Sequence, residues 1–256
     1  MLLDLHQYVL GVVSGVLVGF SLGLFGGGGS ILAVPLLVHL VGLPNPHQAI
    51  GTSAVAVAAN ALAGIASHAR HGTIRWRCVA VYGSAGVMGA AIGSEIGKAL
   101  DGQHLLALFA GLMLVVSLTM LLRRHAGGDA SCTCDARNAP KVLTFGAGTG
   151  LCSGFFGIGG GFLIVPGLIA STGMPMINAI GSSLVIISAF GITTATSYFF
   201  SGFVVWPLAL AFIGGGAAGA GIGCRLAHRL SRYNRVMNTL FAGLIACVAV
   251  LLFARS

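Results

Sequence analysis

Long apolar stretches separated by short polar loops run through the whole chain. Ten apolar segments can be marked, at about residues 7–25, 30–43, 48–68, 78–97, 104–122, 142–157, 161–173, 178–200, 206–224 and 236–254. Most of them approach the roughly 20 residues that a helix needs to span a bilayer. The pattern therefore predicts an all-α integral membrane protein.

The second half of the sequence repeats the first half. GLFGGGGSILAVP, which begins at Gly23, matches GFFGIGGGFLIVP, which begins at Gly154. AIGTS, which ends at Ser53, matches AIGSS, which ends at Ser183. The repeat predicts two transmembrane units of about five apolar segments each, at residues 1–122 and 142–256, joined by a linker at 123–141.

Two of the apolar segments, 30–43 and 161–173, are too short to span a bilayer. Each follows a cluster of glycines and contains a proline, Pro35 or Pro166. Broken backbone at membrane depth is tolerated only inside protein or beside a watery cavity. Interrupted segments at matching places in two repeats are typical of transport sites.

Basic residues set the expected orientation. Only 7% of the residues are charged, whereas a soluble domain has about 25%, which indicates an integral membrane protein. The net charge of +8 does not indicate nucleic-acid binding, because the basic residues are confined to short loops between apolar segments. The loops at 69–77, 123–141 and 225–235 hold eleven of the 13 Lys and Arg residues. If every segment changes sides, these loops share one side, which the positive-inside rule makes cytoplasmic. We therefore expect two inverted units in the inner (cytoplasmic) membrane, with both termini outside.

The contiguous glycines are the first candidates for chemistry. Consecutive glycines at a helix start expose backbone N–H groups, and the helix N-terminus carries a partial positive charge, so together they favour an anion. Glycines that only permit close packing are the alternative, and it fits the glycines spaced four apart before each cluster. The predicted anion ligands are Gly26, Gly27, Gly28 and Gly29 in the first unit and Gly157, Gly159, Gly160 and Gly161 in the second.

Polar side chains inside the apolar segments are the second group of candidates. Thr52 and Ser53 match Ser182 and Ser183. These hydroxyls either donate to the oxygens of an anion or cap the helices that begin near them. Asn60 lies deeper in the same segment and needs a partner there, on a neighbouring helix or along the path of the substrate.

Acidic residues are too few for a cation carrier. The chain has five of them, and only Glu95 is near an apolar segment, whereas cation carriers and proton pumps bury carboxylates. The substrate is therefore expected to be anionic or neutral. His39 and His68 lie near segment ends, where ordinary interfacial residues are the simpler interpretation.

The six cysteines offer weaker signals. Cys132 and Cys134 form a C-x-C in the linker, where a soft metal or a redox role competes with an incidental loop. A structural disulfide is not expected in a reducing compartment. The others, Cys78 included, are interpreted as small core residues. No metal or cofactor, catalytic group or nucleotide motif is predicted.

The repeated motif resembles a known family. G-x-F-G-x-G-G-[GS]-x-x-x-V-P, followed by A-I-G-[TS]-S and present in both halves, is similar to the pattern of the sulfite exporter TauE/SafE family, from Leu10 to Leu252. The resemblance implies passage of sulfite, sulfonates or related sulfur anions across the cytoplasmic membrane.

The sequence thus predicts a secondary transporter, and an exporter, of small sulfur-containing anions, embedded in lipid and not an enzyme. An anion channel is a neighbouring possibility. A membrane-embedded thiol enzyme or redox sensor that uses the C-x-C linker is the alternative from another class, and a structural membrane subunit is a third. The sequence does not predict the oligomeric state.

Overall fold

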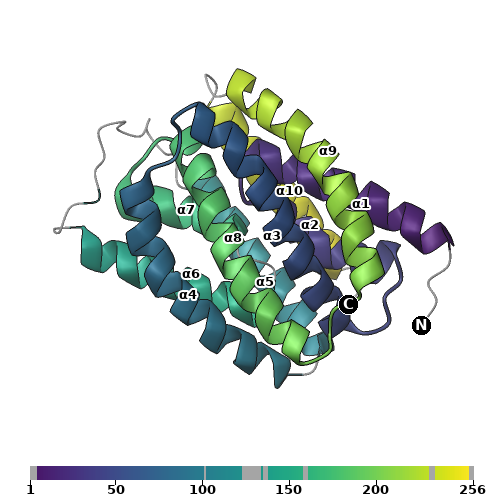
Figure 1. Ribbon diagram of the computed structural model, residues 1–256. Helices are drawn as coiled ribbons and strands as arrows, with labels where there is room; N and C mark the ends of the chain where they lie inside the picture. Colours follow the sequence, from purple (N-terminus) through teal and green to yellow (C-terminus); the bar gives the residue numbers. More distant parts are fainter. Residues whose placement is uncertain are drawn as a thin grey trace.

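The computed structural model describes residues 5–100, 102–122, 134, 138–157, 161–230 and 234–253, and these residues form helices and connecting turns (Figure 1). The first unit contains α1 (Leu5–Phe25), α2 (Gly28–Pro35), the π-helix η1 (Leu36–Leu40), α3 (Pro46–Arg70), α4 (Trp76–Lys98) and α5 (Gly102–Leu122). The second contains α6 (Ala139–Phe156), α7 (Gly161–Thr172), α8 (Met176–Phe200), α9 (Trp206–Leu230) and α10 (Asn234–Phe253). The all-α prediction is confirmed, and every predicted segment corresponds to a helix.

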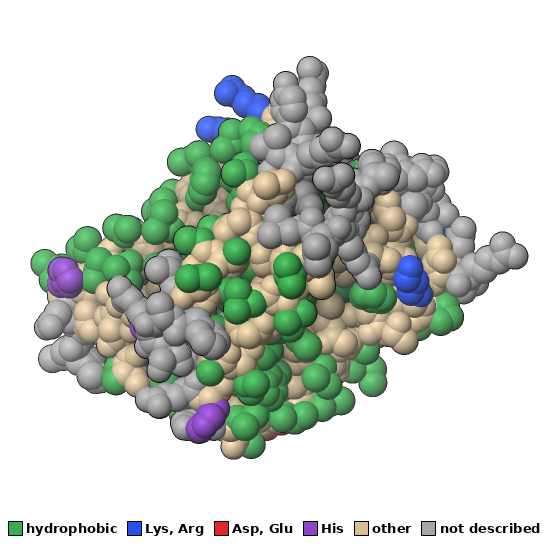
Figure 2. All heavy atoms as spheres, turned by 180° about the vertical axis from the view of Figure 1, so that it is seen from behind, with side chains coloured by type: hydrophobic (Ala, Val, Ile, Leu, Met, Phe, Trp, Pro, Cys, Tyr) green, Lys and Arg blue, Asp and Glu red, His purple; other side chains and the backbone are tan. Residues whose placement is uncertain are grey.

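Several helices are suited to a bilayer. In the described part of the chain, five helices are long and apolar enough to cross a membrane, namely α1, α3, α4, α8 and α9. Large apolar side chains such as Leu62, Met88 and Leu210 point outward. Figure 2 shows hydrophobic side chains over much of the rear face, with the visible Lys, Arg and His side chains near its edge. The protein is a multi-pass membrane protein.

The first helix of each unit packs along the fourth helix of the other. Helices α1 and α9 lie side by side, and so do α4 and α6 (Figure 1). A Cβ at Gly15 would meet the backbone of Phe212, and one at Gly19 that of Gly216, so α1 and α9 run parallel. The same holds in α6, where Gly146 and Gly150 contact Tyr82 and Gly86 of α4. Close packing by the spaced glycines is confirmed.

The matching helices α3 and α8 lie against each other at the centre of the bundle. Gly64 of α3 contacts Leu184, near the start of α8, whereas Gly191, further along α8, contacts Ala58 and Ala54. The two helices therefore run antiparallel. This direction is the one that inverted units require and supports that prediction, while the orientation in a bilayer stays a prediction.

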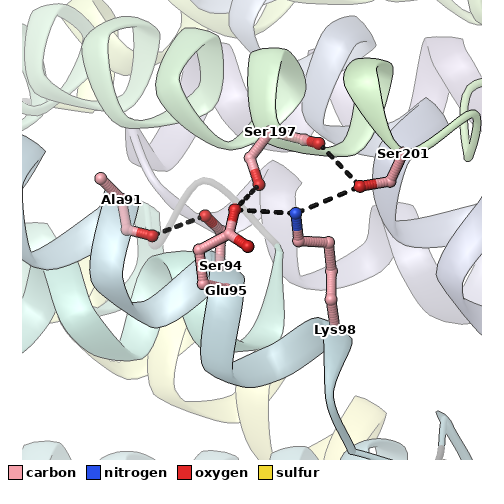
Figure 3. Close-up of polar contacts among 6 residues, drawn as sticks. All are labelled: Ala91, Ser94, Glu95, Lys98, Ser197 and Ser201. Carbon is pink, nitrogen blue, oxygen red and sulfur yellow. Dashed lines mark hydrogen bonds and ion pairs between the residues drawn. The ribbon is translucent and has the colours of Figure 1, made fainter.

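A polar cluster joins the two units where α4 and α8 end (Figure 3). Lys98 Nζ lies 2.7 Å from Glu95 Oε1 and donates to Ser201 Oγ at 3.1 Å. Ser197 Oγ donates to the same Glu95 oxygen at 2.8 Å. Glu95 is 68% exposed, so the ion pair contributes little stability. The cluster therefore pairs, at the surface, the one acidic side chain of the described residues.

A disulfide joins the linker to the first turn of α4. Cys78 and Cys134 are bonded, with Cα atoms 5.4 Å apart. The expectation that a disulfide is absent and that Cys78 is a plain core residue was wrong. Because α6 runs parallel to α4, with Gly146 level with Tyr82, the start of α6 lies near the start of α4, where Cys134 is bonded to Cys78. Cys132 lies outside the described residues.

Candidate functional site

A left-handed glycine ends the first helix of each unit. Gly26 follows α1 with φ +72°, and Gly157 follows α6 with φ +64°. Side chains other than glycine rarely adopt this conformation, so glycine is required for the chain to turn here. The breaks lie within the bundle, because Gly23, just before the first, still contacts Ala220 and Cys224 inside α9.

The two breaks touch each other. A Cβ at Gly27 would meet the carbonyl group of Gly161, and a Cβ at Gly161 would lie 2.7 Å from Gly27 Cα. Helix α2 begins at Gly28 and α7 at Gly161, so two helix N-termini are neighbours. No side chain caps α2 at Gly27; instead, the buried Ser30 donates from its hydroxyl to the Gly27 carbonyl. The first N–H groups of α2 thus have no partner within their own helix.

Each break packs against the start of the long central helix of the other unit. A Cβ at Gly26 would lie 2.7 Å from Ser183 Oγ and 2.8 Å from Ile180 Cα, both in α8. A Cβ at Gly157 would meet Ile50 of α3. Ser53 and Ser183 are fully buried and donate to the carbonyls of Ile50 and Ile180. These two isoleucines are not among the predicted site residues, although the repeated A-I-G motif marks both positions.

Each of the other two hydroxyls binds a loop of the opposite unit. Thr52 Oγ1 accepts from the Val205 N–H at 3.0 Å, just before α9, and Ser182 Oγ accepts from the Arg75 N–H at 2.9 Å, just before α4. The capping alternative for these pairs is wrong, because α3 is capped by Asn45 and α8 begins at Met176. Thr52 and Ser182 fix α9 and α4, and anion binding by them stays a prediction.

Asn60 is fully buried and unpaired. Its Oδ1 and Nδ2 atoms make no hydrogen bond, and its amide lies against Gly216 of α9, at the α1–α9 contact. The matching residue in the second unit, Phe190, lies against Gly86 in the same way. At this matched position α3 therefore carries a polar side chain and α8 an apolar one.

Of the remaining predicted glycines, Gly29 packs against a neighbouring helix and two lie outside the described residues. Gly29 packs on α1, where a Cβ would meet the Val18 carbonyl and Leu22. Gly159 and Gly160 lie outside the described residues. The structure thus brings together Gly26, Gly27, Gly161 and Ser183, and it gives the contiguous glycines a packing role whether or not they bind an anion.

Metal-binding side chains do not gather in the described part of the chain. No group of three or more His, Cys, Asp or Glu there is placed to hold a metal ion. Cys134, for which a soft-metal role was only an alternative to an incidental loop, is in the disulfide. The buried His68, near the end of α3, forms a hydrogen bond between its Nδ1 atom and Thr73 Oγ1 at 3.0 Å. This contact holds the turn that follows α3.

Comparison with known proteins identifies the family. The model of the family described as "Sulfite exporter TauE/SafE" matches residues 11–252. The chain belongs to the sulfite exporter TauE/SafE family. A probable membrane transporter protein of Xylella fastidiosa (strain Temecula1) is 47% identical over 99% of this chain and 98% of its own length. A probable membrane transporter protein of Haemophilus influenzae is 31% identical over 76% of this chain and 74% of its own length. The probable membrane transporter protein YunE of Bacillus subtilis is 26% identical over 90% of this chain and 92% of its own length.

No solved structure matches the chain. Membership in the TauE/SafE family makes this protein a membrane transporter, and the similar proteins are named probable membrane transporter proteins. The alternative of a thiol redox enzyme receives no support from the family or from these relatives.

Proposed function

We propose that this protein is a secondary transporter that exports small anions, with sulfite or an organosulfonate as cargo and with backbone N–H groups at the two glycine breaks as its main ligands. One observation carries the proposal: the N-termini of α2 and α7 are neighbours at Gly27 and Gly161. Each helix N-terminus carries about half a positive charge, so two of them repel unless an anion lies between them.

The lack of an unpaired carboxylate among the described residues supports the same conclusion. Glu95 is the one acidic residue in the described part of the chain, and it pairs with Lys98 at the end of α4. An anion from solution is then the natural counter-charge for the two helix ends. Discontinuous helices use their N-termini in this way in other secondary transporters.

A matched pair of serine variants tests the site. Ser183 and Ser188 are both buried in α8 and both donate to a carbonyl of their own helix, but only Ser183 adjoins Gly26. Ser183→Ala is expected to weaken sulfite affinity about tenfold or more: when the anion binds, the Ser183 hydroxyl is proposed to turn from the Ile180 carbonyl to the anion, and the variant loses that hydrogen bond to a charged group. Ser188→Ala is expected to leave affinity unchanged. Flux of labelled sulfite in proteoliposomes, with and without a pH gradient, measures both, and equal effects would contradict the assignment.

The glycines give a second test. Gly28→Val and Gly159→Val are expected to abolish flux in protein that still inserts, because a side chain blocks the approach to the N–H groups. Gly148→Val is the control, since a Cβ there meets open space. Near-normal flux in the first two variants would leave amide binding without support. Exchange without steady electrical current separates a carrier from a channel.

A further inference from the structure

The disulfide lies beside a contact between the two units. Cys78 is the third residue of α4, three residues after Arg75, whose N–H donates to Ser182 of the second unit. Thr73 of the same turn contacts Gly181 of α8. The Cys78–Cys134 bond therefore fastens the linker between the units to the turn where the first unit holds the second. We call this bond the linker clasp.

The two sulfur atoms of the linker clasp differ in accessibility. Cys78 is 2% exposed, whereas Cys134 is only partly buried. A nucleophile attacks one sulfur in line with the bond and expels the other as a thiolate. Access favours attack on Cys134, with Cys78 leaving.

The start of α4 offsets part of the cost of forming a buried Cys78 thiolate. Cys78 lies in the first turn of α4, where N–H groups lack partners within the helix and the helix end is partly positive, and both features stabilise an anion. Arg77 precedes it and is exposed. Lys141 of α6 is exposed at the same level, because α4 and α6 run parallel with Tyr82 beside Gly146. These cations attract an anionic nucleophile to the bond.

We propose that the linker clasp is a covalent site for sulfite-class anions, which attack Cys134 Sγ and release Cys78. The sulfur lone pair of sulfite forms a new S–S bond to Cys134 as the disulfide bond breaks, and the electron pair of that bond leaves on Cys78 Sγ. The products are an S-sulfonate and a thiolate. The reverse attack, by the Cys78 thiolate on the S-sulfonate, expels sulfite and closes the bond, so the cycle needs no outside oxidant or reductant.

Opening the linker clasp frees the linker from α4. Carriers of this kind move one repeat against the other, so a covalent tie at the contact between the units slows that motion. Sulfite at high concentration would then release its own transporter. This regulatory role rests on the proposed function, because it takes the cargo as the ligand, whereas the covalent chemistry does not.

The test uses the full chain in lipid nanodiscs, treated with sodium sulfite under non-reducing conditions. Intact mass and peptide mapping are expected to show one sulfite on Cys134, and maleimide added to the denatured protein is expected to label a newly free Cys78, which is buried in the folded state. Removal of sulfite restores the disulfide. Sulfate, which lacks a lone pair on sulfur, is expected to give no adduct, and Cys134→Ser none. Cys132→Ser keeps the reaction, which excludes the neighbouring thiol.

Further variants test the steering charges and the regulation. Arg77→Gln with Lys141→Gln is expected to slow adduct formation about tenfold at low salt and little at high salt. Cys134→Ser is expected to transport several-fold faster than wild type at low sulfite. A Cys78 thiol that is free before sulfite is added, an adduct elsewhere, or no adduct would each overturn the proposal. Sulfite flux that persists without an adduct would overturn the clasp alone, whereas an adduct without flux would overturn the transport function alone.

Discussion

Asn60→Leu is expected to stabilise the protein while it lowers flux. The Asn60 side chain is fully buried, and neither of its polar atoms has a hydrogen-bond partner. A buried polar group without a partner costs about 1–3 kcal/mol. Leucine has nearly the same shape and branches at the same atom, so it removes this cost with little change in packing. The free energy of unfolding should rise by about 1–3 kcal/mol, a 5- to 150-fold change in the equilibrium.

Unfolding in mixed detergent micelles, followed by circular dichroism, measures the stability, and sulfite flux in proteoliposomes measures the activity. Phe190→Leu is the matched control at the equivalent position of the second unit. It is expected to lose about 1–2 kcal/mol because it leaves a cavity. An Asn60→Leu protein less stable than wild type would refute the reasoning, since the amide would then have a partner that the variant loses. Unchanged flux would remove Asn60 from the substrate path.

Three further predictions concern packing and topology. Thr52→Val and Ser182→Ala should each lower the free energy of unfolding by about 1–3 kcal/mol, because a backbone N–H loses its acceptor. The control Thr193→Val loses only a hydrogen bond within its own helix and should cost clearly less. Equal losses in the three variants would contradict this reasoning. Gly150→Val should strongly reduce the yield of folded protein, because a Cβ there overlaps the backbone of Gly86, whereas Gly148→Val on the same helix should be tolerated, as size-exclusion chromatography can check. Reporter fusions after Gly102 and Ser231 should report opposite sides, and the same side for both would disprove the inverted topology.

The helices were predictable because the local signal is strong. Apolar stretches bounded by charged or Gly-containing loops mark their own ends, and the repeated motif marks the two breaks. The packing role of the spaced glycines followed from their period, since residues four apart share a helix face. In each case the information lies within one segment of the sequence.

The pairing of segments was not predictable in the same way. Nothing in the sequence near Gly15 indicates that Phe212 is its neighbour, and only the fold places Thr52 beside the Val205 N–H. The disulfide was missed for the same reason, because it depends on the parallel packing of α6 on α4. The capping interpretation failed because α3 begins earlier, at Pro46, than its apolar stretch suggests.

The exchange of partners between the units has a consequence for synthesis in the cell. The glycine face of α1 is covered by α9, and Gly15 and Phe212 are separated by roughly 200 residues, which take about 10–40 s to translate at bacterial rates. During that time the newly inserted α1 exposes close-packing glycines to lipid or to temporary neighbours. The N-terminal half therefore reaches its final packing only after the C-terminal half has emerged from the ribosome.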